Sequence, residues 1–258
     1  MTTLRYWDCQ GRGEPLRMML EDWEVPYTNE VIPLEQEAEW EERRNYSSFA
    51  GPFGQLPVLE FVEPEELRTV VQTPAIAQYI ALKADPAWLS KPPSVAELTK
   101  TLAYGNMAYE DLMVPLLKCI FNTSMAVKTI GNGVPRVLER VEEILSVVQE
   151  DVTGAFAAGT LSEEDSVYLL GPLPAYPDYL LFHAISVLKD IGVASPIFKM
   201  FPNVEAHFTS MQQRPNLASY LTSGRRPQRI TSCKTEAKNK RVIVDALQAV
   251  GFFDAAGN

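Results

Sequence analysis

The chain has 258 residues, 46% hydrophobic and 22% charged, which is typical of a globular protein with room for one large domain or two small ones. Its 23 Lys and Arg against 33 Asp and Glu give a formal net charge of −10, which argues against nucleic-acid binding by the main body. Three cysteines are too few for a disulfide framework, and two histidines leave little room for a zinc site. The sequence has no run of the roughly twenty apolar residues that a membrane span needs and no signal-peptide core, so we expect a cytoplasmic protein. We also expect no bound metal.

The first part of the chain alternates strand and helix patterns. Pro15 stands where a helix tolerates proline best, in the first turn, where the missing N–H costs nothing. The expected elements are a strand at residues 4–7, a helix at 15–23, a β-rich segment at 27–32, a hairpin of strands at 58–62 and 68–72, and a helix at 73–83.

Residues 84–93 contain three prolines and predict a linker, because proline cannot continue a helix. Beyond the linker the apolar spacing is helical. Ser94 and Glu97 form a capping-box pattern at the start of the first helix. Pro115 predicts a kink in that helix. Further helices are expected at residues 137–148, 177–190 and 203–213.

The charge changes sign at residue 225. Residues 225–258 carry seven Lys and Arg against three Asp and Glu, and their Val242, Leu247 and Val250 suit one short amphipathic helix. Such a tail can contact an acidic protein surface or nucleic acid, although terminal Lys and Arg are usually only solvated. We therefore expect domains at 1–83 and 94–224, a linker at 84–93 and a basic tail at 225–258.

Three segments carry a resemblance to a known family. Residues 4–7 (LRYW) run into residues 11–17 (GRGEPLR), and they are followed by residues 53–59 (FGQLPVL) and 72–76 (QTPAI). In this order, and before a helical domain, they resemble the cytosolic glutathione transferases of the tyrosine type (alpha, mu, pi and sigma classes) over residues 1–224. The resemblance implies a thioredoxin-like α/β domain that holds glutathione, an all-α domain that holds a hydrophobic electrophile, a role in detoxification and a homodimer.

Tyr6 is the catalytic residue that the resemblance implies, because its place five residues before Gly11 matches the family motif; a lone tyrosine would otherwise be a core aromatic. Largely ionising a thiol of pKa near 8.5 at neutral pH requires a drop of about 2 units, or about 2.7 kcal/mol. A hydrogen bond to the charged sulfur supplies about 1.5–3 kcal/mol, and a nearby helix N-terminus adds up to about 2 kcal/mol. These two contributions suffice without a general base.

The resemblance also implies the residues that bind glutathione. A cis bond before Pro57 would present the backbone of Leu56 to the cysteinyl part, and the helix start at Gln72 and Thr73 suits the γ-glutamyl carboxylate. Thr73 replaces the serine of the family. Asp111 would reach glutathione in the other subunit of the dimer. Trp40 would face the glycyl end, with Arg43 or Arg44 in place of the family's lysine. The full set is Arg12, Trp40, Arg44, Gln55, Leu56, Pro57, Gln72, Thr73 and Asp111.

Several of these residues also have a simpler structural interpretation. Gly54 and Pro57 fit a simple turn, Arg12 a solvated charge, and Asp111 an acidic helix face. The electrophile would contact Trp7, Cys9, Leu117 and Phe121, although apolar residues at such spacing are usually core. Ala175 stands where the family carries a Ser or Thr helix cap, which predicts a weaker helix start unless another group substitutes.

Other functions fit the same sequence. Cys9 precedes a helix start that would lower its pKa, which suits a glutathione-dependent thiol transferase, but the second cysteine of a Cys-x-x-Cys pair is missing. A peroxidase or isomerase would use the same thiolate. The fold also serves non-enzymatic interaction modules, so fold alone does not decide function.

Overall fold

The computed structural model describes residues 2–62, 67–85, 88–89, 91–157 and 167–254. The chain forms two compact units, Met1–Pro93 with Pro215–Ser232, and Ser94–Arg214 with Cys233–Asn258. The turn of the expected hairpin and part of the expected linker lie outside the described residues. The expected second domain and tail are thus each divided between the two units.

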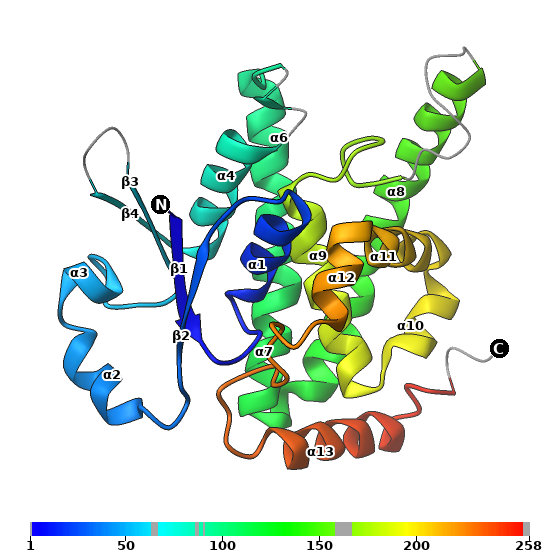
Figure 1. Cartoon of the computed structure of the whole chain (residues 1–258). Coiled ribbons are helices and arrows are strands. Elements are labelled where there is room, and N and C mark those ends of the chain that lie inside the picture. Colours follow the sequence, from blue (N-terminus) through cyan, green and yellow to red (C-terminus); the bar gives the residue numbers. More distant parts are fainter. Residues whose placement is uncertain (1, 63–66, 86–87, 90, 158–166, 255–258) are drawn as a thin grey trace. The chain divides into compact units, whose positions relative to one another are not determined.

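The first unit contains a mixed four-stranded sheet of order β2-β1-β3-β4 (Figure 1). Central β1 runs parallel to β2 and antiparallel to β3, and β3 pairs with β4 as a hairpin. Side chains of β1 alternate between the two faces, so Leu4 and Tyr6 point one way and Arg5 the other. The strands are β1 (Thr2–Trp7), β2 (Thr28–Ile32), β3 (Val58–Val62) and β4 (Leu67–Val71), which confirms the expected strands.

Helices cover both faces of this sheet. Figure 1 shows α1 (Glu14–Asp22) and α4 (Thr73–Ala84) on one side and α2 (Glu37–Arg43) and α3 (Ser47–Ala50) on the other. Residues of α12 (Pro215–Thr222) pack on α1, an arrangement that the sequence did not indicate. The unit therefore has the expected thioredoxin-like character and an additional C-terminal element.

The second unit is helical. Its capping box is confirmed, because Ser94 Oγ accepts the Glu97 N–H at 3.2 Å and Glu97 Oε2 accepts the Ser94 N–H at 2.6 Å. Just before Pro115, where the sequence predicts a kink, the chain forms a π-helical turn, a feature that commonly accompanies kinks. The elements are α6 (Val95–Asn106), η1 (Met107–Met113), α7 (Val114–Phe121), η2 (Thr123–Met125), η3 (Val127–Gly133), α8 (Val134–Ala157), α9 (Tyr176–Ile191), α10 (Ala194–Met200), α11 (Pro202–Gln213) and α13 (Glu236–Ala249).

The core of this unit is built around α9. Except for Lys189 and Asp190, every residue of α9 is buried, including the expected core histidine His183. Helices α6, α10 and α11 pack against it. None of the helices in the described ranges is long and apolar enough to cross a membrane.

The expected tail helix exists as α13, but its buried face differs from the predicted one. Ile243 and Leu247 point inward, one helical turn apart, whereas Val242 and Val250 are 40% and 57% exposed. Val250 follows the last helical residue, and Val242 is turned about 100° away from Ile243. Leu247 alone of the three predicted apolar positions is in the core.

Candidate functional site

Tyr6 lies near the end of β1, and its side chain is 6% exposed. Its hydroxyl oxygen accepts the backbone N–H of Arg12 at 2.9 Å, just before α1. Burial raises the pKa of the Tyr6 phenol above its ordinary value of 10.0, so the phenol keeps its proton at neutral pH. A protonated phenol whose oxygen is already held by one donor is oriented to donate its own hydrogen bond to an acceptor.

The glycines of the Gly-Arg-Gly motif make room for this ring. A Cβ at Gly13 would lie 2.5 Å from Tyr6 Cδ1, and one at Gly11 would lie 2.5 Å from the Tyr6 oxygen. Gly11 also has a φ of +42°, which favours glycine. The motif therefore lets the loop close over Tyr6.

The start of α4 joins the same loop. Thr73 is 1% exposed, and its hydroxyl donates to the carbonyl oxygen of Arg12 at 3.2 Å. Arg12 is thus bonded through its N–H to Tyr6 and through its carbonyl to Thr73. The structure brings these three predicted site residues together.

Two glutamines lie next to this helix start. The Gln72 amide donates to Gln55 Oε1 at 3.0 Å, and both side chains are exposed. Gln72 has a φ of +74°, a conformation that a non-glycine residue holds only under local constraint. The Leu56–Pro57 bond is cis, as the resemblance implied. These residues surround the N-terminus of a twelve-residue helix, where free N–H groups favour an anion.

Trp40 belongs to an aromatic cluster on the other face of the sheet. Its ring meets that of Trp7 edge-on with the centroids 5.3 Å apart, and both pack with Leu56 on Ile32 and Phe49. The cluster ties the end of β1 to α2 and to the residue before the cis proline.

Two arginines follow Trp40 along the chain. The Arg43 guanidinium lies 3.5 Å from the centroid of the Phe49 ring. Arg44 pairs with Glu41 at 3.1 Å, and its guanidinium lies 5.8 Å from the centroid of the Trp40 ring. Both guanidinium groups therefore lie against rings of the aromatic cluster, Arg43 over Phe49 and Arg44 over Trp40.

The expected electrophile contacts are divided between the units. Cys9 is 2% exposed in the first unit, which leaves its thiol little surface for a substrate. In the second unit, Leu117 is 7% and Phe121 is 56% exposed, so Leu117 belongs mainly to the core. Asp111 is exposed on the π-helical turn η1.

Sequence reasoning missed a buried ionic network beneath the loop. Arg17 and Glu14, both 0% exposed, pair at 3.3 Å. Arg17 also donates to the carbonyl oxygens of Trp7 at 3.1 Å and Cys9 at 3.0 Å. Both charged residues stand inside the motif at residues 11–17, but nothing in the local sequence showed that they are buried.

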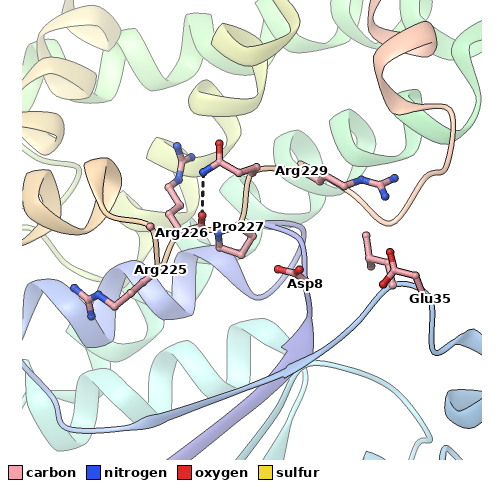
Figure 2. A pocket seen from close by; sticks show the side chains of 9 residues that line it. Asp8, Glu35, Arg225, Arg226, Pro227 and Arg229 are labelled. Atoms are coloured by element: carbon pink, nitrogen blue, oxygen red, sulfur yellow. Dashed lines mark hydrogen bonds between the residues drawn. The ribbon is translucent and has the colours of Figure 1, made fainter.

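A charged pocket of about 360 Å³ lies in the first unit (Figure 2). Figure 2 shows Asp8 and Glu35 on the loops that follow β1 and β2, facing the segment after α12 that carries Arg226 and Arg229. Its lining comprises Asp8, Leu34, Glu35 and residues 224–229, none of which was a predicted site residue. Among the residues that the structure describes, no group of three or more His, Cys, Asp or Glu side chains is arranged to hold a metal ion.

Comparison with known proteins adds to this geometry. Residues 110–224 match the family model described as the glutathione S-transferase C-terminal domain. A glutathione S-transferase of Dirofilaria immitis is 24% identical over 223 residues, covering 84% of this chain and 90% of that protein. The chain is thus similar to glutathione S-transferases, through the family model over residues 110–224 and at low identity over most of its length.

Solved glutathione S-transferases share the fold of the chain. The Pi-class enzyme of Onchocerca volvulus has a TM-score of 0.64 at 23% identity, covering 85% of this chain and 91% of its own. The sigma-class enzyme of Fasciola hepatica has a TM-score of 0.62 at 21% identity, covering 85% and 94%. The expected fold, a thioredoxin-like α/β unit with an all-α unit, is confirmed.

Proposed function

We propose that the chain conjugates the thiol of glutathione to hydrophobic electrophiles and that Tyr6 stabilises the reacting thiolate. The main support for this proposal is the buried, protonated Tyr6 phenol, whose oxygen accepts the Arg12 N–H just before α1. A hydrogen bond from this phenol to the sulfur favours the thiolate by about 1.5–3 kcal/mol. The thiol proton passes to solvent, the sulfur attacks the electrophilic carbon, and the leaving group departs with the bonding electrons.

The polar groups around α4 support glutathione as the substrate. In this proposal the N-terminus of α4, with Gln72 and Thr73, holds the γ-glutamyl carboxylate. The exposed Gln55 amide, which already bonds Gln72, adds a further polar group there. The backbone of Leu56 pairs with the cysteinyl residue, and Trp40 with Arg44 contacts the glycyl end. Arg12 contributes through its backbone, which links Tyr6 to Thr73.

Further parts of the proposal rest on the family. We infer a cytoplasmic homodimer with a role in detoxification, in which exposed Asp111 reaches the glutathione of the other subunit. Trp7 and Phe121 contact the electrophile. No metal takes part in this reaction scheme, because the thiolate itself is the nucleophile.

Burial of Cys9 favours conjugation over thiol transfer. A thiol transferase needs a cysteine that is reactive and partly exposed, and Cys9 is 2% exposed in its unit. Peroxidase and isomerase reactions would use the same Tyr6-stabilised thiolate and are distinguished by their substrates.

The test is glutathione conjugation to a chlorinated nitroaromatic at neutral pH. We expect the wild type to be active and Tyr6→Phe to lose at least tenfold in kcat/KM, about 1.4 kcal/mol of transition-state stabilisation. Tyr27→Phe is the matched control, because that hydroxyl donates to Glu21 instead, at 3.1 Å. An inactive wild type would contradict the function, and a fully active Tyr6→Phe would contradict the role of Tyr6.

A further inference from the structure

Residues 227–230 are hydrogen-bonded to the loop at residues 10–13, which contacts Tyr6. The N–H of Gln10 donates to the carbonyl oxygen of Arg229 at 2.8 Å, and the N–H of Gly11 donates to that of Ile230 at 2.7 Å. The Gln10 amide also donates to the carbonyl oxygen of Pro227 at 3.2 Å. Ile230 is 0% exposed, so these residues are packed into the core of the first unit.

The same part of the chain is attached a second time at Glu14, the residue after Gly13. Glu14 is 0% exposed, and its Oε1 accepts from Arg226 Nε at 2.9 Å. Its Oε2 accepts from the Tyr220 hydroxyl at 3.1 Å and from Arg17 at 3.3 Å. Two of the three donors to this buried carboxylate therefore come from residues more than 200 positions away.

Arg12 lies between these two attachments. Gly11, on its N-terminal side, is held by Ile230, and Glu14, two residues beyond it, is held by Arg226. The N–H of Arg12 is the group that fixes the Tyr6 oxygen. Any movement of Gly11 or Glu14 therefore changes the hydrogen bond that orients the phenol.

We propose that Arg226 is a positioning residue for Tyr6, which it serves by clamping Glu14 and hence the loop at residues 10–13. This inference rests on the proposed function for its effect on catalysis, but the clamp itself is testable without glutathione. Loss of the Arg226 side chain leaves a buried carboxylate with one charged partner in place of two. A buried charge that loses a partner is strongly unfavourable, so the start of α1 is expected to rearrange.

Arg225 provides a matched control. It belongs to the same segment and pairs with a glutamate of the same helix, Glu21, at 2.6 Å. That pair lies toward the other end of α1, and the Arg225 side chain is 60% exposed. Exposed pairs contribute little, so Arg225→Gln changes the charge as Arg226→Gln does but leaves the loop unaltered.

The first measurement is amide hydrogen exchange in the full chain without ligand. We expect Arg226→Gln to accelerate exchange at Gly11 and Arg12 by about tenfold or more, because local opening of the loop becomes easier. Arg225→Gln leaves these rates unchanged, and Arg226→Lys, which keeps a donor to Glu14, gives an intermediate increase. Unchanged exchange in Arg226→Gln would overturn the proposal whether or not the protein is a transferase.

The second measurement is the pKa of the thiol of bound glutathione, followed by thiolate absorbance. We expect Arg226→Gln to raise it by about one unit, a tenfold fall in the ionisation constant of the thiol, while Arg225→Gln leaves it unchanged. A raised thiol pKa with unchanged amide exchange would show a direct effect of charge and would overturn the positioning role. If wild-type protein forms no thiolate, the proposed function fails, and the exchange rates still decide the clamp. If Arg226→Gln does not fold, Arg226→Lys serves for both measurements, and wild-type behaviour in it would overturn the proposal.

Discussion

Gly13 faces the base of the Tyr6 side chain without space for a side chain of its own. A Cβ at this position would approach Tyr6 Cδ1 to 2.5 Å, Cγ to 2.6 Å and Cβ to 3.0 Å. These atoms belong to a buried side chain anchored in the central strand, so they have little room to move. The close approach of the loop to the ring therefore excludes any side chain at residue 13.

Gly13→Ala is expected to lower the free energy of unfolding by about 1–3 kcal/mol, the usual range for overpacking a core. Urea denaturation measures the loss. The control is Gly224→Ala, because a Cβ there has no neighbour within 4 Å. Equal stability of Gly13→Ala and the wild type would contradict the packing described for Tyr6.

The N-terminus of α9 shows how an element adapts to a missing cap. Ala175 has the extended conformation of an N-cap residue but no side-chain acceptor. The Asp178 carboxylate accepts the N–H groups of Leu169 and Ala175, both at 2.8 Å, and pairs with His207 Nε2 at 2.8 Å. This buried carboxylate makes the reciprocal bond of a capping box, to the Ala175 N–H, and ties α9 to α11.

Ala175→Ser is expected to raise the free energy of unfolding by about 0.5–2 kcal/mol, since a hydroxyl there can accept the Asp178 N–H. In the structure that N–H donates to the Ala175 carbonyl oxygen at 3.0 Å. The measurement is chemical denaturation beside Ala175→Gly, which lacks the acceptor. A serine variant no more stable than the wild type would contradict the expectation that this helix start lacks a needed cap.

Elements with local signals could be predicted from the sequence. The Ser94–Glu97 capping box depends on residues three apart, and the loop around Tyr6 depends on glycines within seven positions of it. The contact of Arg226 with Glu14 spans 212 positions and has no local pattern, so the sequence could not place it. Burial of Cys9 and the inward face of α13 likewise depend on tertiary packing.

Across the whole molecule, buried tyrosines predict a loss of stability at high pH. Burial raises the phenol pKa of Tyr6, Tyr27 and Tyr220, and it raises that of Tyr176 to about 12. An unfolded phenol loses its proton near pH 10, while these phenols keep theirs in the folded state. The folded state therefore binds more protons above about pH 10, and stability falls as the pH rises further.

Thermal unfolding measured from about pH 8 to 12 tests this expectation, because this range brackets the ordinary tyrosine pKa of about 10. We expect a constant midpoint up to about pH 10 and a falling midpoint above it, with a shallower fall in Tyr176→Phe. A midpoint that fell equally steeply in this variant would exclude Tyr176 as one source of the alkaline sensitivity.

The proposal that Tyr6 stabilises the thiolate of glutathione is tested most directly by the ultraviolet difference spectrum of glutathione bound at neutral pH. The account predicts thiolate absorbance with the wild type and with Tyr27→Phe, and at least tenfold less with Tyr6→Phe when glutathione saturates all three. Equal thiolate absorbance in the wild type and Tyr6→Phe would contradict the assignment of Tyr6. Glutathione that binds the wild type only as the neutral thiol would contradict the proposed chemistry.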